Sequence, residues 1–269
     1  MPANDLALLV DAARAAGEIA TPHWGQSPKT WEKDAGAGPV TEADIAVNDM
    51  LRDQLCAARP DYGWLSEETE DDADRLSRKH VFIIDPIDGT RSFIANEKTW
   101  AHSLAVARNG QVTAAVIFLP MLDKLYAANL GGGAWLNGVQ IRHSGREQLD
   151  QAEILASRPV MQAQHWPGGV PPVTRHFRPS LAYRMALVAE GRFDAMITFR
   201  DTWEWDVAAG NLIATEAGAL TSDRRGKPVL FNNPHPALNG MIAGTARVHH
   251  ALYSRHNLGA GEPATGSQS

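Results

Sequence analysis

The hydrophobic residues of this chain recur with a helical period in its first part. Residues 5–19 carry apolar side chains three or four positions apart, which predicts a first helix. The same spacing over residues 44–58 predicts a second helix. Between them, residues 25–40 are rich in glycine, proline and charge, which indicates a loop or a loose hairpin.

Short apolar runs predict strands in the middle of the chain. Residues 64–65 form a short strand, residues 81–84 a buried one, and a helix follows Thr90. Further strands are predicted over residues 103–108, 112–119 and 124–129. The three glycines at 131–133 are interpreted as a hairpin turn and not as a phosphate loop, because no helix follows them.

The second half of the chain alternates between strand and helix patterns. Strands are predicted over residues 153–157 and 194–199, and helices over residues 180–190 and 206–217. A polar stretch near residues 142–149 marks a boundary between two halves. The predicted organisation is an N-terminal α+β half over 1–145, a C-terminal α/β half over 146–258, and a disordered tail over 259–269.

Two carboxylates, Asp85 and Asp88, lie three residues apart where the predicted strand 81–84 ends. Taken alone, such Asp-Pro and Asp-Gly pairs form turns more often than metal sites. A strand that ends in this turn can still direct both carboxylates and a backbone carbonyl to one place, and Mg²⁺ prefers such oxygen ligands. Gly89 allows close approach of a ligand, and Thr90 can open a helix whose N–H groups face an anion.

Two further segments favour the metal hypothesis over the turn interpretation. Glu67 belongs to a pair of acids that follows an apolar stretch, and Asp206 opens an apolar run with a helical pattern. Four acids therefore stand at the ends of apolar elements: Glu67, Asp85, Asp88 and Asp206. Buried carboxylates are costly unless they are paired or bound to metal, so several converging ones are expected around cations.

Together these segments resemble the inositol monophosphatase family of lithium-sensitive, magnesium-dependent phosphatases. The family pattern is present in order as Glu67-Glu68, Asp-Pro-Ile-Asp-Gly-Thr at 85–90, and Trp-Asp at 205–206. A fourth match is Pro-Val-Thr-Glu-Ala-Asp at 39–44, and the similarity extends from about residue 5 to about residue 245. The resemblance implies an α+β fold, the layered αβαβα sandwich of the inositol monophosphatase/fructose-1,6-bisphosphatase type.

The resemblance also implies a metal site. Glu67, Asp85 and the carbonyl of Ile87 would hold one magnesium ion. Asp85, Asp88 and Asp206 would hold a second, with Asp85 bridging. A third, weaker ion would share Glu67, so the expected cofactor is Mg²⁺ as two or three ions.

Catalytic and phosphate-binding roles follow from the same resemblance. Thr90, oriented by Asp44, and Glu67 are expected to accept the proton of the attacking water. The N–H groups of Gly89 and Thr90 are expected to hold the phosphate. Asp44 is alternatively a helix N-terminal acid. Lys33 lies eleven residues before Asp44, where the family often has a lysine near metal and phosphate, although a lysine in a polar loop is usually solvated.

Phe199 argues against an inositol phosphate as the substrate. Inositol-phosphate enzymes of the family often carry a glutamate at this position, seven residues before the Trp-Asp aspartate. Segments 65–68 and 187–191 look more like bacterial 3′(2′),5′-bisphosphate nucleotidases. The main prediction is therefore hydrolysis of 3′-phosphoadenosine 5′-phosphate to AMP and phosphate. Phe199, Trp203 and Trp205 would form a wall for the base, although tryptophans beside a helix start are more often core residues.

Three other functions remain open. Inositol-1-monophosphatase is the first alternative. A histidinol-phosphate or sugar phosphatase is another, because residues 88–94 read Asp-Gly-Thr-Arg-Ser-Phe-Ile as in histidinol phosphatases. The remaining alternative is a non-catalytic phosphosugar-binding protein on the same fold, which loss of a metal ligand would indicate; none is lost.

Composition narrows the partners and the compartment. The 269 residues are 44% hydrophobic and 21% charged, as in an ordinary soluble globular protein. The net charge of −6 argues against a nucleic-acid polymer but permits a small phosphorylated metabolite, because bound cations reverse the local field. Cys56 is the single cysteine, and neither a membrane span nor a signal peptide is recognised, so a cytoplasmic protein is expected. A homodimer is also allowed.

Overall fold

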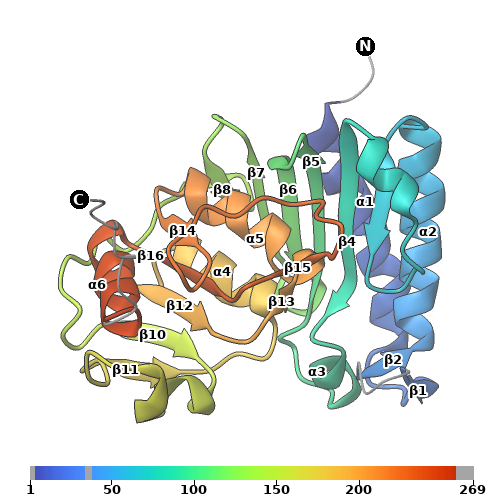
Figure 1. The fold of residues 1–269 in the computed structure, drawn as a ribbon. Helices are drawn as coiled ribbons and strands as arrows, with labels where there is room; N and C mark the ends of the chain where they lie inside the picture. The colour runs from blue at the N-terminus through green and yellow to red at the C-terminus, as the bar shows by residue number, and fades with distance from the viewer. Residues whose placement is uncertain (1–3, 34–37, 259–269) are drawn as a thin grey trace.

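The computed structural model describes residues 4–33 and 38–258, so the predicted tail over 259–269 lies outside the described residues. Five layers follow one another across the molecule (Figure 1). Two helices cover a seven-stranded sheet, two more helices separate it from a five-stranded sheet, and a last helix covers the far face. The predicted α+β fold with αβαβα layering is confirmed.

The helices of the three helical layers have the following bounds. The outer layers are α1 (Asp5–Ala20) with α2 (Glu42–Ala58) on one side, and α6 (Ala246–His256) on the other. The central layer consists of α4 (Leu181–Ala189) and α5 (Glu204–Glu216). All but α6 were predicted; α6 escaped because it is mostly polar and buries only Val248, His249 and Leu252.

The first sheet is an antiparallel meander with one parallel pair at its edge. Its strands are β3 (Gly63–Ser66), β4 (His80–Asp88), β5 (Ala101–Arg108), β6 (Gln111–Leu119), β7 (Lys124–Asn129), β8 (Ala134–Leu136) and β9 (Val139–Ile141), side by side in this order. Only β3 and β4 run parallel. The glycines at 131–133 lie in the turn between the antiparallel strands β7 and β8, which confirms the hairpin prediction.

The second sheet is mixed and has the order β11-β10-β12-β16-β14. Its strands are β10 (Glu153–Ala156), β11 (Thr174–His176), β12 (Ala195–Thr198), β14 (Leu220–Ser222) and β16 (Met241–Gly244). Two small ladders pair β1 (Thr30–Glu32) with β2 (Pro39–Thr41), and β13 (Thr202–Trp203) with β15 (Ala237–Leu238). The predicted strands 153–157 and 194–199 correspond to β10 and β12.

Alternating side chains on β4 explain why helices cover both faces of the first sheet. Phe82 and Ile84 are buried in the core that α1 and α2 form with this sheet. Val81 and Ile83 point to the opposite face and pack in the core that contains α4 and α5. Successive strand residues face opposite sides, so a continuous apolar run requires a helical layer on each face.

The second sheet repeats this arrangement. On β12, Met196 packs in the core with α4 and α5, whereas Ala195 and Ile197 pack in the core that includes Val248 and Leu252 of α6. The central helices therefore have apolar layers on both sides. All nine residues of α4 are buried, which follows from this central position.

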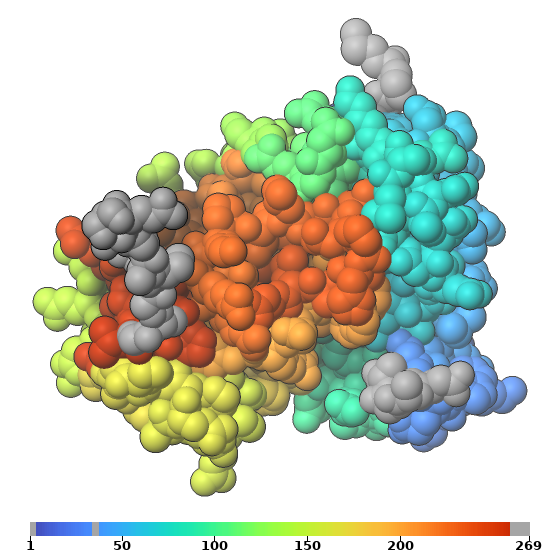
Figure 2. All heavy atoms as spheres, viewed as in Figure 1, coloured from blue at the N-terminus to red at the C-terminus, as the bar shows by residue number. Residues whose placement is uncertain are grey.

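The polar boundary predicted near residue 145 lies between β9 and β10. Across the molecule, residues of the second half pack directly against the first, as the orange and cyan surfaces show (Figure 2). Arg75, which is 2% exposed, donates to the side chain of Asn232 at 2.7 Å and to the carbonyl of Asn233 at 3.0 Å. None of the described helices is long and apolar enough to span a bilayer.

Candidate metal centre

Strand β4 carries a bulge between Asp85 and Asp88. Three residue steps separate these acids, whereas their partners on β5, Ser103 and Ala101, are two steps apart. The extra residue interrupts the ladder, and Pro86, which has no N–H to donate, lies within the interruption. The bulge is the structural form of the Asp-Pro-Ile-Asp turn recognised in the sequence.

His102 supports the bulge from the neighbouring strand. Its Nδ1 lies 2.5 Å from the carbonyl oxygen of Pro86, and its side chain is fully buried. Burial lowers the pKa of His102 to about 4, so the ring is neutral at neutral pH. A carbonyl only accepts, so Nδ1 carries the proton and donates it to Pro86.

Three acids from separate elements meet beside the bulge. Carboxylate oxygens of Glu67, Asp85 and Asp206 all lie within 4.8 Å of one another. Glu67 follows the end of β3, Asp85 begins the bulge of β4, and Asp206 lies in the first turn of α5. The structure thus brings together three of the four acids that the sequence singled out, each at the end of an apolar element.

Asp85 is the most deeply buried member of this cluster. Its Oδ1 atom is buried and has no hydrogen-bond partner among the described residues. Burial, followed by the charges of Glu67 and Asp88, raises the pKa of Asp85 well above its ordinary value. The pKa of Asp206 is also raised well above its ordinary value, by removal from water and by the charge of Asp88. A bound cation would relieve both effects.

Asp88, the fourth acid, is held by the start of α4. Its Oδ2 accepts a hydrogen bond of 2.6 Å from the Ser180 hydroxyl and one of 2.7 Å from the Ala182 N–H. Burial raises the pKa of Asp88 to about 6, and these two hydrogen bonds act in the opposite direction. Sequence analysis missed Ser180; its place directly before an apolar helix is an N-cap signal, but it does not reveal the contact with Asp88.

Asp44 makes the contacts expected for both interpretations that the sequence left open, the helix N-terminal acid and the partner of Thr90. Its Oδ2 accepts from the Thr41 N–H at 2.8 Å and the Thr41 hydroxyl at 2.5 Å, which forms a capping box at the start of α2. Its Oδ1 accepts from the Thr90 hydroxyl at 3.2 Å. The same hydroxyl lies 3.1 Å from the carbonyl oxygen of Ile87. Burial raises the pKa of Asp44 to about 6.

Lys33 lies inside the acidic cluster and is not a solvated loop residue. Its Nζ donates to Glu67 at 2.7 Å and to Glu68 at 2.5 Å, and its side chain is 15% exposed. Burial acts to lower the pKa of Lys33, but both glutamates outweigh it and the pKa is raised. Burial and the charge of Glu67 raise the pKa of Glu68 to about 7. Lys33 therefore supplies positive charge beside Glu67.

Gly89 adopts a backbone conformation that glycine favours. Its φ of 101° is left-handed, and it caps the five-residue helix α3 (Thr90–Ile94). A Cβ at this position would lie 3.5 Å from the carbonyl oxygen of Thr99, so the space is adequate and the φ angle is the constraint. The predicted phosphate contact of the Gly89 and Thr90 N–H groups remains a prediction.

The three aromatic residues assigned to a substrate wall have different environments. Phe199 is 5% exposed and stacks on His256 with ring centroids 3.9 Å apart. Trp205 is half-buried, and Trp203, which is 42% exposed, stacks on it at 4.9 Å. Trp203 thus presents the largest exposed aromatic area of the three.

Two arginines that sequence analysis did not consider lie close to the acids. Arg184 is 5% exposed, and its guanidinium donates to the carbonyl oxygen of Arg178. Burial lowers the pKa of Arg184 to about 10, while the charges of Asp88 and Asp206 act to raise it. Arg200 also acts on Asp206, since its charge lowers the pKa of that carboxyl against the larger effect of burial. No local sequence pattern signals either electrostatic interaction.

The whole described site lies within a region that matches a known protein family. Residues 2–257 match the model of the inositol monophosphatase family. The chain belongs to the inositol monophosphatase family. As a member, it is a phosphoric monoester hydrolase, and the resemblance inferred from the acidic motifs is confirmed.

Relatives of this inositol monophosphatase family member span nearly its whole length. An inositol-1-monophosphatase of Rhizobium meliloti is 35% identical over 232 residues, covering 82% of this chain and 86% of the relative. The Nus factor SuhB of Escherichia coli is 28% identical and covers 92% of this chain and 93% of its own length. An IMPase structure from Thermotoga maritima superposes with a TM-score of 0.81 at 28% identity, covering 95% of this chain and 97% of that one. These names favour the inositol-1-monophosphatase alternative over the nucleotidase prediction.

Proposed function

We propose that the chain hydrolyses small phosphomonoesters at the carboxylate cluster with Mg²⁺ as cofactor. The observation that carries this proposal is the buried Oδ1 of Asp85, which has no hydrogen-bond partner among the described residues and lies in the cluster with Glu67 and Asp206. A buried carboxylate oxygen without a donor is costly, and a cation is the partner that such a set of oxygens fits. The four acids and one backbone carbonyl are hard oxygen ligands without histidine or cysteine, as Mg²⁺ prefers.

The ligand assignment follows the family resemblance. Glu67, Asp85 and the Ile87 carbonyl would hold one ion, and Asp85, Asp88 and Asp206 a second. A third ion would share Glu67. Magnesium, when bound, lowers the pKa of a water molecule and offsets charge on the phosphate oxygens.

The proton of the attacking water would pass to the chain's own residues. Thr90 is suited to accept it, because its hydroxyl hydrogen is already directed at Asp44 or at the Ile87 carbonyl. Asp44 has a pKa of about 6 and is therefore largely ionised at neutral pH, so it can receive a proton from Thr90. Glu67 is the second candidate base. Lys33, which contacts Glu67, would balance charge beside the phosphate.

Inositol 1-phosphate is the first substrate to test, because relatives at 35% and 31% identity are named inositol-1-monophosphatases. The nucleotide 3′-phosphoadenosine 5′-phosphate is the second, because Phe199 has no group to accept from a sugar hydroxyl. Glu204 does not replace it: both carboxylate oxygens are occupied, by the Asn232 N–H at 2.6 Å and the Asn233 N–H at 2.9 Å. Asp201 is exposed and is the remaining acid in this segment.

The deciding experiment is phosphate release from inositol 1-phosphate, 3′-phosphoadenosine 5′-phosphate and histidinol phosphate. Each is measured in matched Mg²⁺, with and without lithium, and after EDTA treatment. Release that requires Mg²⁺ and is lost in Asp88→Asn supports the proposal. Absence of release from every compound, with folded protein, would favour a non-catalytic binding protein and overturn it.

A further inference from the structure

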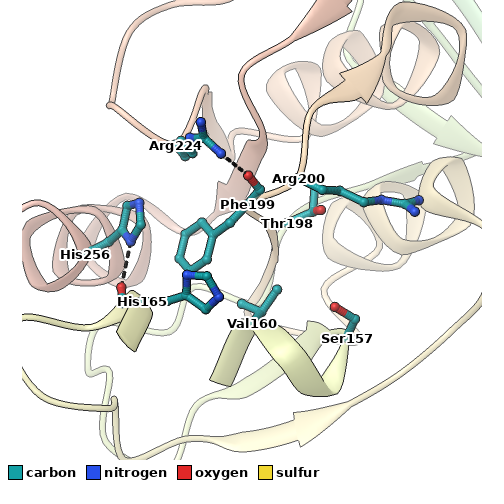
Figure 3. Close-up of a pocket in the computed structure, with 8 residues that line it drawn as sticks. All are labelled: Ser157, Val160, His165, Thr198, Phe199, Arg200, Arg224 and His256. Carbon is teal, nitrogen blue, oxygen red and sulfur yellow. Dashed lines mark hydrogen bonds between the residues drawn. The ribbon is translucent and has the colours of Figure 1, made fainter. Parts of the chain in front are cut away.

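A basic cavity lies at the end of β12, apart from the carboxylate cluster. Its volume is about 460 Å³, which is within the range of small-molecule sites. Four of its residues are basic: Arg200, Arg224, His165 and His256. None of the eight residues drawn in Figure 3 is acidic, although the chain as a whole carries a net charge of −6.

The two arginines of this cavity are not held by a direct contact with an acid of the described residues. Neither guanidinium forms an ion pair within the described part of the chain. Arg224 uses a guanidinium N–H to hold the Phe199 carbonyl oxygen, and a guanidinium has five N–H groups. His256 directs Nδ1 to the carbonyl oxygen of His165 at 2.7 Å. The walls thus present several N–H donors, and no carboxylate in the described part of the chain accepts from the two arginines.

The chain segment after β12 connects the cavity to the carboxylate cluster. Arg224 and His256 lie on one side of the cavity, and the Arg200 side chain lies on the opposite side and extends away from them (Figure 3). Arg200 precedes Asp206 by six residues, and its charge reaches that carboxyl. One wall of the cavity is therefore shared with the segment that leads to the metal centre.

We propose that this cavity binds a phosphate group other than the one that is hydrolysed. Unpaired guanidinium groups are suited to this task, because their planar arrangement of N–H donors matches phosphate oxygens. The group is either the second phosphate of a bisphosphorylated substrate or part of a separate phosphorylated metabolite. The first source rests on the proposed function, whereas binding of the second does not.

The kinetic test compares two compounds that differ by one phosphate group. These are 3′-phosphoadenosine 5′-phosphate and adenosine 3′-monophosphate, each assayed for phosphate release in Mg²⁺. In the parent, the bisphosphate is expected to have a kcat/KM about tenfold or more above that of the monophosphate. Arg224→Gln should remove most of this preference while lowering the value for the monophosphate much less.

Two further variants keep the test decisive. Arg225→Gln is the matched control, because Arg225 is exposed on the same loop and does not line the cavity; it should retain the parent preference. Ser157→Asp places a carboxylate in the cavity wall without touching the Arg224 contact with Phe199, and it should reduce the preference like Arg224→Gln. Thermal melts verify that each variant is folded.

A binding measurement without Mg²⁺ separates the two sources and the two proposals. Adenosine 5′-monophosphate, titrated by calorimetry, should bind the parent and the Arg225→Gln variant. Its affinity for the Arg224→Gln and Ser157→Asp variants should be at least about tenfold lower. The ligand is a separate metabolite if adenosine 5′-monophosphate binds but the bisphosphate is not preferred as a substrate. In that case adenosine 5′-monophosphate should change the hydrolysis rate without competing with the substrate. Absence of all hydrolysis would contradict the proposed function but would not affect the conclusion from the binding measurement. If the parent shows no preference for the bisphosphate and does not bind adenosine 5′-monophosphate, the cavity proposal is overturned.

Discussion

Ser180 donates a hydrogen bond of 2.6 Å to Oδ2 of Asp88, which precedes it by 92 residues. The contact joins the N-cap of α4 to the bulged end of β4. Since Ala182 also donates to Oδ2, the other carboxylate oxygen of Asp88 is left for a metal ion. The orientation of a proposed ligand thus depends on a helix from the second half of the chain.

Ser180→Ala should lower the affinity for Mg²⁺ strongly and the free energy of unfolding only slightly. Partners that orient metal ligands typically contribute about 10–100-fold in metal affinity or activity. The Mg²⁺ concentration for half-maximal activity should rise accordingly. Asn4→Ala is the control, because it removes the N-cap bond of α1, at 2.8 Å, far along the chain from the site. Both variants should lose about 1 kcal/mol of stability; equal Mg²⁺ requirements would contradict the assigned role of Ser180.

Asp88→Asn should reduce kcat by about 10²–10³, on the scale of other electrostatic contributions to a charged transition state. The amide keeps the size of the side chain but removes its negative charge. Steady-state kinetics at saturating Mg²⁺ measure the effect. Asp11→Asn, which alters an exposed acid on α1, should leave kcat unchanged. Near-parent activity in folded Asp88→Asn protein would refute the metal assignment.

Asp206→Ala should abolish turnover without unfolding the protein. Removing this carboxylate relieves repulsion with Asp88 and Glu67, so the metal-free variant should be at least as stable as the parent. Because Asp206 would be the only ligand from α5, the rise in melting temperature on adding Mg²⁺ should shrink markedly. An equal Mg²⁺-induced rise in parent and variant would exclude Asp206 as a ligand.

The stability of the metal-free chain and the stability gained from Mg²⁺ should change with pH in opposite directions. Burial raises the pKa of both Asp44 and Asp88 to about 6 in the folded metal-free chain, against about 3.9 when unfolded. Between these values the folded state binds more protons at these two groups, so their contribution to the free energy of unfolding is full below about pH 4 and is lost as pH rises through about 6.

Magnesium competes with protons for its carboxylate ligands, among them Asp88, so its stabilising effect should grow from pH 5 to pH 7.5. Urea unfolding at pH 5, 6 and 7.5, with and without Mg²⁺, measures both trends. The Asp11→Asn variant, which changes no buried carboxyl, should behave as the parent. An Mg²⁺-induced stabilisation that is the same at pH 5 and pH 7.5 would contradict the role of the buried carboxylates.

Local sequence patterns were enough to predict most of the helices and strands of the layers and the main acids of the site. The helical period of residues 5–19 and the apolar run 81–84 report burial directly, because helices and strands bury side chains at fixed spacings. Asp85 could be found because it stands where such a pattern ends, and Asp206 because it stands where one begins. The helix α6 could not, since its polar sequence has few buried positions.

Which residues meet was decided by tertiary structure. Lys33 reads as a loop residue, yet it contacts Glu67, 34 positions away. Arg184 lies on an apolar helix, and its proximity to Asp88 leaves no trace in the residues around it. Periodicity specifies which side of an element is buried but not what covers it. The sequence by itself therefore indicated the family and the acids of the site, and only the tertiary structure decided which acidic and basic side chains meet.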